Sequence, residues 1–275
     1  EVLGEGRSWG PLNGAMKQDM LERQDHIRYD VEWSTLGEYL EHLVRRGVSP
    51  NVASFVGATT VRIHELGYED RPPTPDELAR MGQLVREAME EGAVGLSTAL
   101  IYPPASYADT DELVALASVV SDYDGLYISH IRNEAHHLLE ALDELLLIAR
   151  TTGVRAEVYH LKVSGRDNWH KLDAVINKIE AARAEGLEVT ADMYTYPASS
   201  TGLSATIPPW VEEGGRRAWL ARLADPETRT RVLEQMVTPS DEWDNTYRAV
   251  VSPDNVLLVG FRNEALKPLI GKTLA

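Results

Sequence analysis

Short apolar runs and longer amphipathic segments alternate along most of this chain. The short runs are five or six residues long and rich in branched and aromatic side chains, which is typical of buried strands. The sequence predicts strands at residues 51–56, 93–97, 126–130, 156–160, 187–192 and 256–260.

The segments between these runs carry helical periodicity. Thr74 suits the position before a helix, and Pro75 suits its first turn. Apolar side chains then recur with a 3.6-residue period until Gly92 ends the pattern. The same reasoning, applied along the chain, predicts helices at residues 74–91, 109–121, 134–152 and 169–184.

The alternation of strands and helices indicates an α/β fold with a parallel sheet. At least five such units favour a (β/α)8 TIM-type barrel, and an open doubly wound sheet is the alternative. Residues 197–250 break the rhythm and are interpreted as a long insertion after a strand, where barrels keep substrate loops. Both chain ends look like cuts. We therefore expect one domain, 1–275, as an incomplete catalytic barrel whose first-strand and last-strand ends are missing.

Composition narrows the range of partners. The formal net charge of −16 disfavours nucleic acid and anionic membranes. No apolar run reaches the roughly 18 residues of a membrane span. The chain has no cysteine, which excludes disulfides and thiolate ligands and allows a reducing compartment. We expect a cytoplasmic protein that acts on a small molecule, and its oligomeric state stays open.

Polar residues recur where the predicted strands end. His130 and His160 close two successive strands, and Asp192 closes the next. The carboxyl ends of barrel strands share one face, which carries the active site. Two imidazoles there suit a divalent cation, although each histidine has a structural reading as a hydrogen-bonded residue. Asp192 is interpreted as a partner for a histidine.

Three further side chains lie near these strand ends. Lys162 is placed to hold a substrate carboxylate or polarise a carbonyl, or is a surface lysine. The hydroxyl of Tyr194 is placed to donate to a developing oxyanion, or its ring packs beneath the insertion. The turn at residues 4–6 presents the carboxylate of Glu5 between two glycines.

Several segments together resemble the N-acyl-D-amino-acid deacylase (D-aminoacylase) family of the amidohydrolases. They cover much of residues 74–201, whereas residues 1–60 and 250–275 match more loosely. The matching segments are 87–104 (EAMEEGAVGLSTALIYPP), 127–134 (YISHIRNE), 160–165 (HLKVSG), 192–196 (DMYTY) and 199–201 (SST).

The resemblance implies a distorted barrel with a zinc site at its carboxyl face. It implies that His130 and His160 are metal ligands and that Lys162 and Tyr194 contact substrate. Three features depart from the family. No His-x-His occurs, the catalytic aspartate expected as general base would lie beyond Ala275, and Glu5 stands where a metal-ligating cysteine is usual. Glu5 is therefore the third expected ligand, because carboxylates bind such cations.

The function implied is zinc-dependent hydrolysis of N-acyl-D-amino acids, which yields a carboxylate and a free D-amino acid. Zinc would activate water and polarise the amide carbonyl. Two alternatives stay open. One is a related amidohydrolase acting on dipeptides or cyclic amides, like a dipeptidase, dihydroorotase or hydantoinase. The other is a metal-free, non-catalytic binding protein. The preferred side chain, the acyl group and the number of metals are not fixed by the sequence.

Overall fold

The computed structural model describes residues 1–24, 27–240 and 242–275. A short parallel pair near the N-terminus consists of β1 (Val2–Leu3) and β2 (Ala53–Ser54). The main sheet has five parallel strands, which neighbour one another in chain order: β3 (Val56–Gly57), β4 (Gly95–Ala99), β5 (Leu126–His130), β6 (Arg155–Val158) and β7 (Val189–Ala191).

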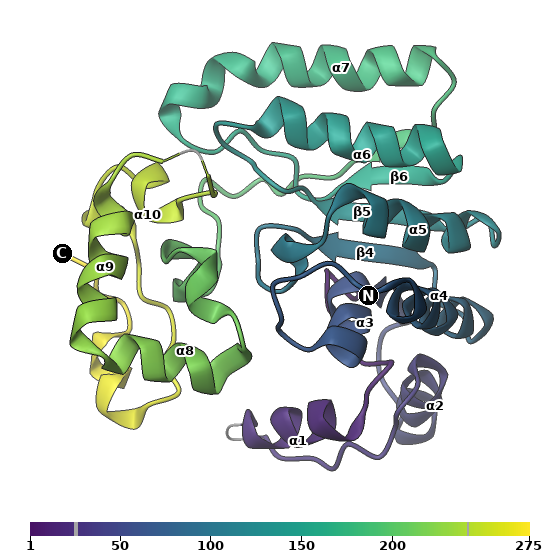
Figure 1. Ribbon diagram of the computed structural model, residues 1–275, viewed down its shortest axis with the longest axis horizontal. Helices are drawn as coiled ribbons and strands as arrows, with labels where there is room; N and C mark the ends of the chain where they lie inside the picture. Colours follow the sequence, from purple (N-terminus) through teal and green to yellow (C-terminus); the bar gives the residue numbers. More distant parts are fainter. Residues whose placement is uncertain (25–26, 241) are drawn as a thin grey trace.

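Helices follow the strands and pack side by side in the same order (Figure 1). Among the described residues, no helix combines the length and the apolar composition needed to cross a bilayer. The helices are α1 (Gly14–Glu22), α2 (Leu36–Arg46), α3 (Ala58–Leu66), α4 (Pro75–Glu90), α5 (Thr110–Ser121), α6 (Leu138–Thr152), α7 (Leu172–Ala184), α8 (Gly215–Ala224), α9 (Pro226–Val237) and α10 (Thr246–Ala249).

The order of the strands identifies the winding. A doubly wound sheet reverses its strand order at a switch point, whereas β3 to β7 advance in one direction and their helices advance with them. This is the winding of a barrel segment. The predicted α/β fold is confirmed as part of a barrel, and the open doubly wound alternative does not fit the described strands.

The boundaries of helices and strands agree with the sequence prediction where neighbouring residues determine them. The predicted strand at 126–130 coincides with β5, and Thr74 caps α4 together with Glu77. Helix α6 begins at Leu138, four residues later than predicted. The carboxamide of Asn133 accepts the backbone N–H groups of Ala135 and His137, so these groups are held in a turn that precedes the helix.

The strand predicted at 256–260 is wrong. This segment is irregular, and its described backbone makes only an isolated antiparallel bridge between Leu257 and Thr273. The side chains of Leu257 and Val259 are exposed. An apolar run becomes a strand only where a neighbouring strand satisfies its backbone. Here the backbone of residues 256–258 bonds to residues 271–274, which do not form a strand.

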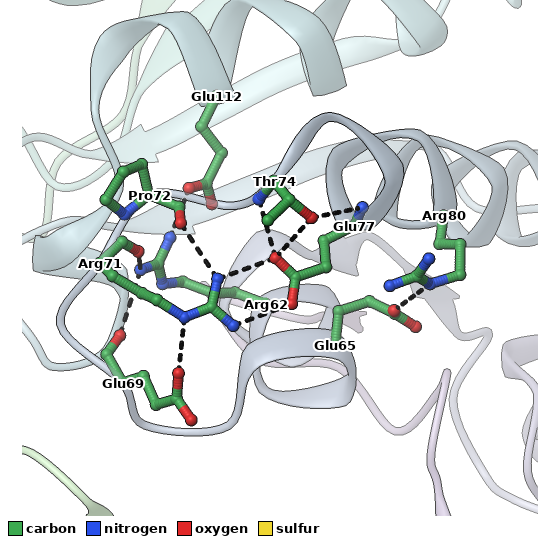
Figure 2. Close-up of polar contacts among 9 residues, drawn as sticks. All are labelled: Arg62, Glu65, Glu69, Arg71, Pro72, Thr74, Glu77, Arg80 and Glu112. Carbon is green, nitrogen blue, oxygen red and sulfur yellow. Dashed lines mark hydrogen bonds and ion pairs between the residues drawn. The ribbon is translucent and has the colours of Figure 1, made fainter.

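A buried ion pair joins α3 to α5. The guanidinium of Arg62 donates to the carboxylate of Glu112, and both side chains are almost fully buried. Arg62 also donates to the backbone carbonyls of Glu69 and Arg71, at 3.3 and 2.6 Å (Figure 2). Arg71 in turn makes a two-pronged contact with Glu77 on α4. The cluster therefore ties one loop to three helices.

The segment after β7 forms a helical layer beside the strand ends, where Figure 1 draws α8 to α10 to the left of the sheet. The hydroxyls of Tyr102 and Thr201 hydrogen-bond at 2.8 Å. The backbone N–H of Glu134 donates to Asp244 at 2.9 Å. Because Tyr102 and Glu134 follow β4 and β5, this layer covers the carboxyl ends of the strands.

Candidate metal centre

Three side chains expected at a metal site converge at the carboxyl ends of the strands. His130 is the last residue of β5, His160 follows β6, and Glu5 follows β1. Nε2 of His160 lies 3.1 Å from Oε1 of Glu5, and Nδ1 of His130 lies 3.5 Å from the same oxygen. One potential ligand atom from each residue lies within 4.8 Å of the others. The topology thus gathers residues 5, 130 and 160 at one point.

The turn that carries Glu5 requires glycine on both sides. Gly4 and Gly6 have φ angles of +105° and +63°, in the region that glycine adopts without strain. A Cβ on Gly6 would lie 2.6 Å from the Cβ of Ala99. The N–H of Gly6 donates to Oγ of Ser97 at 3.1 Å. The close contact of this turn with β4 therefore fixes the backbone position from which the Glu5 side chain extends.

The backbone of His160 is held in an uncommon conformation. Its φ angle is +37°, which non-glycine residues seldom adopt and which is frequent at functional sites. Its N–H donates to the carboxylate of Asp192, and the N–H of Leu161 donates to the Asp192 carbonyl at 2.8 Å. Asp192 thus positions the main chain of His160, whereas the sequence suggested a contact with a histidine side chain.

His130 is buried with unsatisfied ring nitrogens. It is 5% exposed, and neither ring nitrogen makes a hydrogen bond within the described part of the chain. Its ring packs edge-on against the rings of Tyr102 and His160, with centroids 5.4 and 4.5 Å apart. A buried polar group without a partner costs about 1–3 kcal/mol. A cation bound at Nδ1 would remove one of these two penalties.

The spacing of the donor atoms fits a tetrahedral cation. Zinc lies about 2.0–2.2 Å from nitrogen and oxygen ligands, so two ligand atoms of a tetrahedral site are roughly 3.4 Å apart. The separations from Oε1 of Glu5 to His160 Nε2 and His130 Nδ1 are 3.1 and 3.5 Å. Two imidazoles and a carboxylate also match the ligand types that zinc accepts. The residues present therefore fit the metal.

The charges of the cluster are strongly coupled. Contacts with His130 and His160 hold the pKa of Glu5 far below its usual range. Burial opposes protonation of His160, but Glu134 and Glu5 outweigh it and raise the pKa of His160 to about 9. Burial also opposes ionisation of Glu134, yet His160, His130 and Lys162 lower its pKa. At neutral pH, His160 thus carries a proton that a metal would have to replace.

The two expected substrate contacts lie beside this cluster. Nζ of Lys162 is 2.6 Å from Oε1 of Glu134 and 2.8 Å from Nδ1 of His160. It also lies 5.7 Å from the ring centroid of Tyr194, whose ring centroid is 6.4 Å from that of His160. Burial raises the pKa of Tyr194, so its hydroxyl keeps its proton at neutral pH. Contact of either residue with substrate stays a prediction.

Glu134 is the site residue that the strand-end argument missed. It lies four residues beyond His130, on the loop after β5, and its carboxylate reaches back to contact His130, His160 and Lys162. Its place in the segment YISHIRNE was visible in the sequence. Strand periodicity, however, gives no direction for a loop side chain.

A cavity of about 360 Å³ opens next to the cluster. Tyr102 lines it and packs on His130, while Asp244 lines it and accepts the N–H of Glu134. Trp210 and Trp243 supply aromatic walls from the layer that covers the strand ends. This volume falls in the range of small-molecule sites, about 300–1,000 Å³.

In comparisons with known proteins, the chain is similar to deacylases. No family model matches it. D-aminoacylase of Alcaligenes xylosoxydans xylosoxydans is 34% identical over 201 residues, which cover 72% of this chain and 40% of the relative. N-acyl-D-glutamate deacylase of the same organism is 39% identical over 151 residues, covering 55% and 31%. N-acyl-D-aspartate deacylase of that organism is 36% identical over 186 residues, covering 67% and 36%.

Solved structures give the same result. A D-aminoacylase studied for its binuclear metal centre superposes with a TM-score of 0.68 at 30% identity, covering 85% of this chain and 52% of the other. N-acyl-D-glutamate deacylase from Bordetella bronchiseptica, complexed with zinc and a phosphonate inhibitor, gives 0.65 at 34% identity, covering 73% and 42%. The chain spans less than half the length of the curated relatives that it matches.

Proposed function

Because this chain is a homologue of the N-acyl-D-amino-acid deacylases, which are amidohydrolases, we propose that it forms the metal-binding part of such an enzyme. The reaction proposed is hydrolysis of an N-acyl-D-amino acid to a carboxylate and a free D-amino acid. The chain spans about two fifths of D-aminoacylase, so the activity is proposed for a full-length protein that carries these residues.

The convergence of Glu5, His130 and His160 is the observation that supports this proposal most strongly. We propose that His130 Nδ1, His160 Nε2 and a Glu5 oxygen hold a zinc ion, since their separations suit one and neither ring nitrogen of His130 makes a hydrogen bond within the described residues. When bound there, zinc supplies Lewis acidity, which polarises an amide carbonyl and lowers the pKa of water.

The other residues of the chain would bind and orient the substrate. We propose that the hydroxyl of Tyr194 donates a hydrogen bond to the substrate oxygen that becomes the oxyanion, and that the adjoining cavity takes either the acyl group or the side chain. Lys162 would hold the substrate carboxylate. Its ammonium group already pairs with Glu134 at 2.6 Å, so it would contact two carboxylates at once. The general base is proposed to be an aspartate in the part of the relatives that this chain does not match. We also propose that residues 1–275 belong to a single catalytic unit.

The test compares zinc content and turnover in the full-length protein. Wild type should hold stoichiometric zinc and release amino acid from N-acetyl-D-amino acids, but not from their L-enantiomers. His160→Ala should lose both zinc and turnover, whereas His170→Ala, which alters an exposed histidine outside the cluster, should keep both. Zinc-dependent turnover in His160→Ala would remove His160 from the site. Turnover of dipeptides or hydantoins alone would replace the proposed substrate class.

A further inference from the structure

We propose that Glu134 is a positioning residue, a single carboxylate that orients the rings of both His130 and His160. It acts through the ring nitrogens that face away from Glu5. The orientation of the two rings does not depend on the proposed metal function. Only its purpose, binding of a metal by both rings, rests on that function.

The two imidazoles are each placed between the same two carboxylates. Nδ1 of His160 lies 3.2 Å from Oε1 of Glu134, and its Nε2 faces Glu5 at 3.1 Å. Nε2 of His130 lies 3.7 Å from the same Glu134 oxygen, and its Nδ1 faces Glu5 at 3.5 Å. One carboxylate oxygen therefore faces the distal nitrogen of both rings, within hydrogen-bond distance at His160 and beyond it at His130.

This arrangement matches what a metal-binding histidine requires. A neutral imidazole that gives one nitrogen to a cation carries its proton on the other nitrogen. An acceptor at that second nitrogen fixes both the tautomer and the rotation of the ring. At His160, the Glu134 oxygen lies 3.2 Å from Nδ1, beside Nζ of Lys162 at 2.8 Å. At His130, the same oxygen would have to come closer to Nε2 by at least about 0.5 Å to accept its proton.

Glu134 is itself held firmly enough to position other groups. Its side chain is 10% exposed, and Lys162 compensates its charge at 2.6 Å. Its backbone N–H donates to Asp244 at 2.9 Å, and its carbonyl accepts the N–H of Ser164 at 2.7 Å. A carboxylate fixed through its charge and through both backbone groups is preorganised, which is the condition for orienting a ligand shell.

The simpler reading is that Glu134 only pairs with Lys162 and stabilises the loop. The two readings differ in what the histidine rings report. We would record the ring ¹⁵N NMR signals of His130 and His160 in the metal-free chain at fixed pH, and titrate the chain with zinc against a competing chelator. The variant is Glu134→Gln, which keeps the size of the side chain and removes its charge.

The positioning role predicts that Glu134→Gln shifts the ring signals of both histidines and weakens zinc binding about 10- to 100-fold. The matched control is Glu112→Gln, which changes another buried glutamate paired with a cation, in the cluster of Figure 2. In the folded protein, it should leave the ring signals and the zinc affinity unchanged.

Unchanged ring signals in Glu134→Gln overturn the proposal, as does an equal loss of zinc affinity in Glu112→Gln. If wild type binds zinc and Glu134→Gln binds it equally well, the positioning role fails and the metal site stands. If wild type binds no zinc while both ring signals shift, the metal function fails and the positioning role stands. Should Glu134→Gln not fold, Glu134→Asp, which withdraws the carboxylate by one methylene, gives the same comparison.

Discussion

Zinc binding to this chain should strengthen steeply between pH 7 and pH 9. His160 has to lose a proton before its Nε2 can bind a metal, and its pKa is raised to about 9. At pH 7, roughly 1% of the ring is neutral, and the competing proton costs about 2.7 kcal/mol at 1.36 kcal/mol per pH unit. At pH 9, half of the ring is neutral. The affinity should therefore rise about fiftyfold over this interval.

The size of this effect separates the cluster from an ordinary histidine site. A histidine with an unshifted pKa of about 6.5 would change zinc affinity by less than about 1.5-fold between pH 7 and pH 9. Affinity is measured by competition with a chelator whose own protonation is corrected for. His160→Ala should weaken binding and remove the steep dependence, and His170→Ala should preserve it. A flat affinity in wild type would refute the reasoning that Glu5 and Glu134 hold a proton on His160.

Four further predictions concern stability, each measured by urea denaturation. Glu112→Gln should lower the free energy of unfolding by about 3–5 kcal/mol, because it leaves the charge of Arg62 buried without its partner; a loss below about 1 kcal/mol would contradict this. Gly95→Ala should be severely destabilising, since its Cβ would lie 1.9 Å from the carbonyl oxygen of Leu126. Gly82→Ala in α4 meets nothing nearer than 3.7 Å and should stabilise by about 0.5–1 kcal/mol. Finally, the pKa of His160 lies above its unfolded value of about 6.5. Its contribution to metal-free stability should be complete below that pH and lost as the pH rises through about 9, and His160→Ala should not show this loss.

Much of the fold was predictable because local signals decide it. The capping box at Thr74 and the apolar period after it define α4, and the short apolar run around Tyr127 defines β5. The start of α6 was not predictable in this way. It depends on the turn at Asn133 and on the contact between Glu134 and Asp244, which are 110 residues apart in sequence.

Some residues of the candidate site were likewise predictable from the sequence, and others were not. The rule that parallel strands end at one face predicted that His130 and His160 would meet, because both lie at strand ends. Glu5 was selected by resemblance, and its glycine turn explains how it reaches the same point. Glu134 was missed because a loop side chain reaches back over its own strand end, and no periodicity encodes that direction.

The central claim is that Glu5, His130 and His160 share one cation. It is tested most directly by a crystal structure of the protein with zinc, using anomalous diffraction at the zinc edge. We expect an anomalous peak about 2.0–2.2 Å from Nδ1 of His130, Nε2 of His160 and a carboxylate oxygen of Glu5. Zinc bound elsewhere, with both imidazoles free of metal, would contradict it.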